Sequence, residues 1–190
     1  MMAKGQVLLR FLVLNISGFA LLFAAWLQGW VSQLISGDGT RISAGIAVVF
    51  LGGLGLTALR ALRIDRAVSA GSAAPLGYGL TSIDAIRIRL GEELGTVRNI
   101  ANALVFLGLI GTVVGIVIAL SAVDPDAVAD PAKVAPMVAE LVDGMGVALT
   151  TTLVGAVLHL WLSMNYRLIA GGATAFLATL IDARAREQQG

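Results

Sequence analysis

Residues 107–120 read LGLIGTVVGIVIAL, an apolar run that contains three glycines and one threonine. A run of this kind without a charged side chain is typical of a helix inside the hydrocarbon core of a membrane. A simple membrane anchor would use leucine at the glycine positions, so the small residues need a separate reason. The stretch therefore predicts a membrane-spanning helix with one face adapted to a close contact.

The composition of the whole chain agrees with a membrane setting. Its 190 residues are 57% hydrophobic and 13% charged, and the mean hydropathy is +0.88. These values lie far outside the usual range of a soluble domain and predict an integral membrane protein. The net charge of +1 gives no reason to expect a nucleic-acid partner.

Few residues could support catalysis. The chain has one histidine and no cysteine, so the sequence offers no metal-ligand cluster. It also lacks a phosphate-binding glycine loop and a pair of catalytic carboxylates near a membrane pocket. We therefore expect no enzymatic activity, no cofactor and no metal site, and an energy source other than ATP.

Four apolar segments are long enough to cross a bilayer, which takes about 20 helical residues. Because the runs are unbroken, they predict helices rather than barrel strands, in which polar and apolar residues alternate. The expected fold class is all-α, a polytopic membrane protein with four transmembrane helices. We place these helices near 11–35, 42–59, 100–123 and 145–169.

The basic residues indicate how the chain is oriented. Segment 60–99, the two terminal parts and Arg167, near the end of the fourth predicted span, account for eleven of the thirteen basic residues, and the other two are Arg41 and Lys133. By the positive-inside rule, both termini and segment 60–99 are cytoplasmic. Segment 124–143 is then an external loop.

Helical patterns continue outside the predicted spans, within a single membrane domain over 1–190. A stripe at helical spacing predicts a helix that begins near 82 and continues into the third span: Ile83, Ile86, Leu90, Leu94 and Val97. A second stripe predicts a cytoplasmic C-terminal helix over 170–190: Phe176, Leu177, Leu180 and Ile181. In the external loop, Asp130 before Pro131 is an N-cap pattern that predicts a short separate helix.

The glycines of the third span lie on one helical face: Gly108, Gly111 and Gly115. Helices in lipid associate closely where small residues let their backbones approach, so this face should contact another helix. Thr112 borders the face. Its hydroxyl is thus expected close to the same contact.

The fourth span has a matching small and polar stripe. Its members follow each other at spacings of three and four residues: Ala148, Thr152, Gly155, His159 and Ser163. Such a stripe on an otherwise apolar helix should face protein or water rather than lipid.

At these residues the sequence resembles a known family. LGLIGTVVGI followed by GVALTTTLVG is similar to the paired membrane signature of the MotA/TolQ/ExbB proton channel proteins, closest to the TolQ/ExbB form, over roughly 95–166. The resemblance implies that Thr112 and Thr152 lie on an ion pathway. The sequence departs from many ExbB and TolQ members at Val147, where they carry Glu, and at Trp161, where they carry Pro. Four spans are similar to the MotA arrangement, because ExbB and TolQ have three.

The resemblance implies a stator, a motor subunit of the bacterial inner membrane that is driven by the proton-motive force. Five copies would surround a dimer of a single-span partner of the MotB/ExbD/TolR kind, which carries a membrane Asp. Independently, no Asp, Glu, Lys or Arg lies well inside the four spans. A proton relay in lipid ordinarily needs a titratable group, so the partner must supply the carboxylate.

Some alternatives stay open at this stage. The transported ion is H+ by the resemblance, although hydroxyls also suit Na+. His159 is either a proton relay beside Ser163, near the cytoplasmic end, or a neutral imidazole hydrogen-bonded between helices. Gly108, Gly111, Gly115, Ala148 and Gly155 are expected to pack helices or line the pore. The rival function is a passive membrane scaffold that assembles a complex in contact with lipid, without ion flux.

Overall fold

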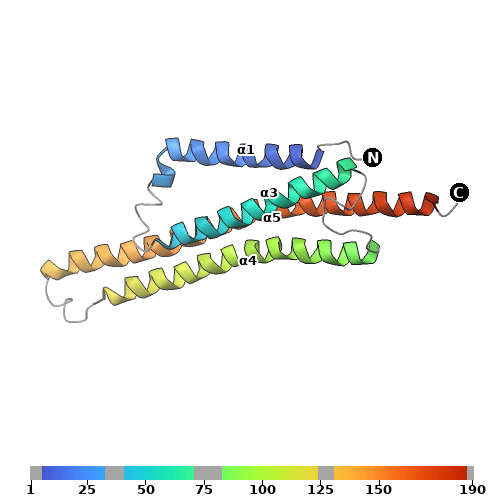
Figure 1. Ribbon diagram of the computed structural model, residues 1–190. Coiled ribbons are helices and arrows are strands. Elements are labelled where there is room, and N and C mark those ends of the chain that lie inside the picture. The colour runs from blue at the N-terminus through green and yellow to red at the C-terminus, as the bar shows by residue number, and fades with distance from the viewer. Residues whose placement is uncertain (1–5, 33–40, 71–82, 124–130, 188–190) are drawn as a thin grey trace. The chain divides into compact units, whose positions relative to one another are not determined.

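The computed structural model describes residues 6–32, 41–70, 83–123 and 131–187 (Figure 1). Its long helices are α1 (Gln6–Leu27), α3 (Ile42–Ala70), α4 (Ile83–Ser121) and α5 (Pro131–Glu187). No strand occurs in these described ranges, and all four helices are long and apolar enough to cross a membrane. The expected all-α fold with four long apolar helices is confirmed. Where the bilayer begins and ends on each helix stays a prediction.

The chain divides into two compact units. Unit 1 comprises Met1–Ala20, Leu51–Ile100 and Trp161–Gly190, and unit 2 comprises Leu21–Phe50 and Ala101–Leu160. All four long helices contribute one part to unit 1 and another part to unit 2.

The core of unit 1 takes apolar side chains from all four helices. Its buried members are Phe11, Ala61, Ile64, Ile86, Leu90, Ile169 and Ala173. The predicted stripe at the start of α4 supplies two of them, because helical spacing places its residues on one face. The second stripe is buried less completely: Phe176 is buried and Ile181 is exposed.

Helix α1 is fixed to α5 in unit 1 by polar side chains. The Asn15 amide nitrogen donates to Asn165 Oδ1 at 2.7 Å and to Phe11 O at 2.8 Å. In return, Asn165 Nδ2 donates to Asn15 Oδ1 at 3.3 Å and to Trp161 O at 3.0 Å. Trp161 Nε1 also donates to Asn15 Oδ1, at 3.1 Å. Both amides are buried, and every one of their N–H groups has an acceptor.

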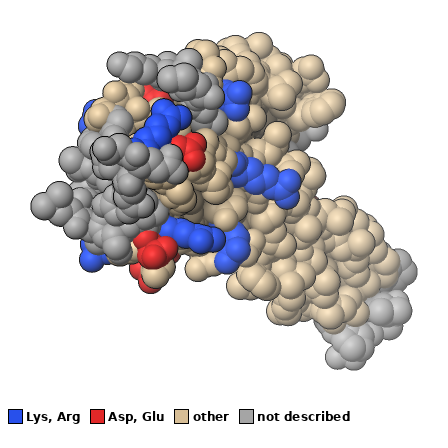
Figure 2. Space-filling view, turned by 90° about the vertical axis from the view of Figure 1, so that its right-hand side faces the viewer, with Lys and Arg blue, Asp and Glu red and all other residues tan. Residues whose placement is uncertain are grey.

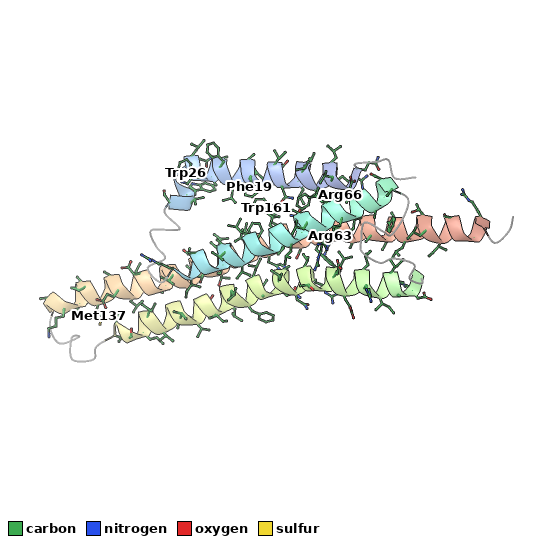
Figure 3. All side chains as sticks on the ribbon, in the orientation of Figure 1. Phe19, Trp26, Arg63, Arg66, Met137 and Trp161 are labelled. Atoms are coloured by element: carbon green, nitrogen blue, oxygen red, sulfur yellow. The ribbon has the colours of Figure 1, made fainter. Side chains whose placement is uncertain are left out.

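An aromatic contact adjoins this amide pair. The rings of Phe19 and Trp161 meet edge to face, with their centroids 5.0 Å apart (Figure 3). Gly18 lies against the same indole, which occupies the space that a Cβ on Gly18 would need. Trp161 of α5 therefore packs directly against α1.

Removing one amide should destabilise unit 1. In Asn15→Leu, the Asn165 amide and the Trp161 indole N–H lose buried partners, so we expect a loss of about 1–2 kcal/mol in unfolding free energy. Thermal unfolding in detergent would measure it. Asn15→Leu/Asn165→Leu should cost less than the sum of its single variants, because the second change strands no additional partner. Asn102→Leu, at an exposed amide, is the control, and equal losses from Asn15→Leu and Asn102→Leu would contradict the interpretation.

The N-terminal part of α5 differs from the expected short separate helix. A single helix runs from Pro131 to Glu187 and includes Pro136. Pro131 is at the first helical position, where its missing N–H costs nothing, and Pro136 removes one intrahelical bond near that end. The proposed cap Asp130 and the loop residues 124–130 lie outside the described residues.

Candidate functional site

Within unit 2, helices α4 and α5 pack against each other in opposite directions. Residue numbers that rise along α4 meet numbers that fall along α5. The neighbours are Leu104 with Gly155, Gly108 with Thr152, Gly115 with Ala148, and Ala119 with Gly144. The glycine face of α4 is thus in contact with α5 of the same chain.

This contact brings the two backbones too close for any side chain. A Cβ on Gly115 would lie 2.5 Å from the Ala148 nitrogen and 2.7 Å from the Gly144 oxygen. A Cβ on Gly155 would lie 2.7 Å from the Leu104 oxygen. Backbone atoms cannot rotate away as side chains can. Glycine is therefore required at both positions for the two helices to approach this closely.

The remaining glycines of the face have more room or softer neighbours. At Gly108 a Cβ would lie 3.1 Å from the Thr151 oxygen, which is tight but less severe. At Gly111 a Cβ would meet the Thr151 side chain. Thr151 is itself fully buried, and its hydroxyl donates to Val147 O, at 2.9 Å, or to Ala148 O, at 3.2 Å. This hydroxyl belongs to helix packing.

The close approach places two other hydroxyls side by side. Thr112 of α4 and Thr152 of α5 are hydrogen-bonded to each other. Thr112 Oγ1 also lies 3.2 Å from Gly108 O and 3.4 Å from Ala148 O. Thr152 Oγ1 lies 3.2 Å from the same Gly108 O. The structure therefore brings the two predicted threonines together around the carbonyl of Gly108. Because Gly108 has no side chain, the helices can approach closely at this point.

The hydrogen-bond chemistry of this group is one-sided. A carbonyl only accepts, whereas each hydroxyl has one proton to donate and two lone pairs. Gly108 O and Ala148 O can take hydroxyl protons, and a hydroxyl can donate to its neighbour, so both protons have acceptors within the group. With both protons used in this way, the pair presents lone pairs to another molecule or ion. It suits a hydrogen-bond donor or a cation.

His159 lies further along α5 in unit 2. Its Nδ1 is 2.7 Å from Ala101 O on α4. Because the carbonyl can only accept, Nδ1 is the nitrogen that donates in this bond. The interhelical bond considered from the sequence is present. Ser163 follows one turn later on α5, in unit 1, and is partly buried.

The described residues provide no titratable acid or metal ligand set next to the threonine pair. Segments 101–123 and 144–160 contain no Asp, Glu, Lys or Arg. Among the residues that the structure describes, no group of three or more His, Cys, Asp or Glu could hold a metal ion.

Sequence reasoning did not single out the amide of Asn165, nor the role of Trp161 beneath α1. Asn165 is fully buried in unit 1. The available signal was an amide in an apolar run, one turn after a tryptophan. Its partner Asn15 is 150 residues away, a pairing that no local pattern shows.

A family model described as the MotA/TolQ/ExbB proton channel family matches residues 80–180. The matched range contains all of α4 and most of α5, and with them the threonine pair, the glycine contact and His159. Comparison with curated proteins and with solved structures gave no match.

Proposed function

The chain belongs to the MotA/TolQ/ExbB proton channel family, and from this we propose that it is an ion-conducting stator subunit. With a single-span partner of the ExbD/TolR/MotB kind, it converts the proton-motive force into mechanical work across the cell envelope. The observation that best supports the proposal is the pair Thr112 and Thr152, joined across α4 and α5 in a segment without charges.

The exposure of Thr152 in the single chain supports a position that faces another protein or water in the assembly. Its side chain is exposed in the single chain, between the exposed residues Leu149 and Leu153. A polar group on a membrane helix ordinarily faces protein or water instead of lipid. In the proposed assembly, five copies surround a dimer of the partner, and this face of α5 turns toward the enclosed partner helices.

The lone pairs of the threonine pair would discriminate between the two states of the partner's membrane Asp. A protonated carboxyl can donate its O–H to a threonine oxygen without disturbing the pair, whereas a carboxylate can only accept, so a threonine hydroxyl must first turn away from its carbonyl acceptor. The pair therefore favours the neutral acid. Gain of a proton lets the partner acid dock at the pair, and loss of the proton releases it, so ion flow changes where the partner helix rests.

We propose that His159 takes part in the exit of the proton. Its Nδ1 is hydrogen-bonded to Ala101 O, and an imidazole is a side chain that can relay protons. Ser163, one turn on, would continue this path toward the end of α5. H+ is the proposed ion. Na+ is the alternative, because hydroxyl and carbonyl oxygens are also ligands of hard cations.

From its family we propose that the protein lies in the bacterial inner membrane, and the distribution of its basic residues supports an orientation with both termini and segment 60–99 in the cytoplasm. A cysteine introduced at Ser69, at the end of α3, should then be shielded from an impermeant thiol reagent applied outside intact cells. A cysteine at Ala127 should react. Labelling at Ser69 without permeabilisation would overturn this orientation.

Ion flux is the experiment that tests the function. The chain and its single-span partner would be reconstituted together in liposomes, and flux measured under a pH gradient and separately under a Na+ gradient. The proposal expects flux under the pH gradient that depends on the membrane Asp of the partner. A passive scaffold would assemble the same complex and conduct nothing under either gradient.

A further inference from the structure

A small cavity in unit 1 is lined in part by Arg60, which has a buried donor without an acceptor among the described residues. The cavity has a volume of about 10 Å³ and is lined by Arg60, Arg63, Ile64, Leu90, Glu93 and Leu94. Nη1 of Arg60 is buried and has no hydrogen-bond partner within the described residues. A buried donor of a charged group without an acceptor costs a substantial part of its solvation energy. The site thus lacks an acceptor that another molecule can provide.

The position of Arg60 along α3 indicates which kind of molecule this is. Arg60 follows directly on the apolar run 42–59, whose last residues Leu56 and Leu59 are exposed. Apolar side chains on the surface of a membrane helix face acyl chains, and an arginine at the end of the run reaches the layer of lipid headgroups. The missing acceptor is therefore expected at headgroup depth.

The charges around the cavity favour an anion. Arg63 and Arg66 follow Arg60 at successive steps of three along α3, and both are exposed (Figure 3). Basic side chains are prominent on the face of the protein in Figure 2, with acidic ones beside them. Glu93 is the one acid in the cavity lining. The two arginines of the lining outweigh it by one positive charge.

We propose that Arg60 and Arg63 bind the phosphate of an anionic phospholipid headgroup at this cavity. Guanidinium groups bind phosphate oxygens through paired charge-assisted hydrogen bonds. A volume of about 10 Å³ holds one water-sized oxygen. It can admit one phosphate oxygen while the rest of the headgroup and its acyl chains lie outside, along α3. The proposal does not depend on ion conduction.

Lipid binding to the purified full-length chain tests this site. Native mass spectrometry from detergent would count phosphatidylglycerol bound per chain as the lipid is titrated, with phosphatidylcholine as the neutral comparison. In Arg60→Gln the apparent affinity for phosphatidylglycerol should fall about 5- to 10-fold, the scale of one arginine at an anionic headgroup. In Arg63→Gln the apparent affinity for phosphatidylglycerol should fall less, because the Arg63 side chain is exposed.

Two further variants separate a defined site from general attraction. Arg87→Gln removes the same charge from an exposed position on α4 outside the cavity lining, and should change binding less than about twofold. Glu93→Gln removes the opposing carboxylate and should strengthen phosphatidylglycerol binding. This opposite sign cannot arise from a variant that merely folds poorly.

Three results would overturn the proposal. Equal losses in Arg60→Gln and Arg87→Gln would show diffuse electrostatic attraction without a site. Unchanged binding in both Arg60→Gln and Glu93→Gln would show that the cavity holds water alone. Displacement of phosphatidylglycerol by an equal concentration of inorganic phosphate would show that the site takes a soluble anion instead of a lipid.

Discussion

A Thr152→Val variant should lose ion-driven flux while its complex with the partner stays assembled. Valine keeps the volume of threonine but removes the oxygen that lies beside Thr112 and Gly108 O. Loss of one hydrogen bond to an ion or to the protonated carboxyl of the partner corresponds to about a 10- to 100-fold loss of flux. Proton flux in liposomes that contain the chain and its partner measures the effect. Size-exclusion chromatography of the same sample verifies assembly.

Matched variants identify the hydroxyl as the cause. Thr152→Ser keeps the oxygen and should retain most of the flux, and Thr112→Val should reduce flux less than Thr152→Val. Thr150→Val makes the same chemical change on a residue that points about 160° away around the helix, so it should matter little. If wild type and the double variant Thr112→Val/Thr152→Val conduct equally, these residues are packing groups and not part of the ion path.

A Gly115→Ala variant should disrupt the pairing of α4 and α5. Its new methyl group would lie 2.5 Å from the Ala148 nitrogen, so the helices must move apart. Overpacking of this kind typically costs about 1–3 kcal/mol, and a rigid backbone neighbour places Gly115 at the upper end. Gly115→Leu should abolish assembly altogether. Thermal unfolding in detergent, followed by determination of the oligomeric state, measures both effects.

Other glycines of α4 provide a graded control. Gly108→Ala should be milder than Gly115→Ala, because the nearest atom to its Cβ would lie at 3.1 Å. At Gly95 a Cβ would have no neighbour within 4 Å. Gly95→Ala should therefore be neutral or stabilising by up to about 1 kcal/mol, the helix propensity gained. Equal losses at Gly95 and Gly115 would show that glycine flexibility, and not close approach, matters at these positions.

The sequence by itself determined the number and type of the main elements. Membrane helices follow from uninterrupted apolar runs, and the start of α4 at Ile83 follows from the spacing of its apolar stripe. These are local properties, since a helix of 3.6 residues per turn places a fixed set of neighbours on one face. Spacing also showed that Gly108, Gly111 and Gly115 form a contact face. It did not show which helix that face would meet.

The tertiary structure decided the partners of these faces. The glycine face meets α5 of its own chain, in a register that joins Thr112 to Thr152, and Asn15 finds Asn165 across 150 residues. The register of two packed helices depends on how their whole surfaces fit. If one small residue stood a turn further along its helix, the helices would pack in another register and different hydroxyls would meet. Local spacing contains no record of that fit. For this reason the residues of the candidate site could be named from the sequence, but their hydrogen bonds could not.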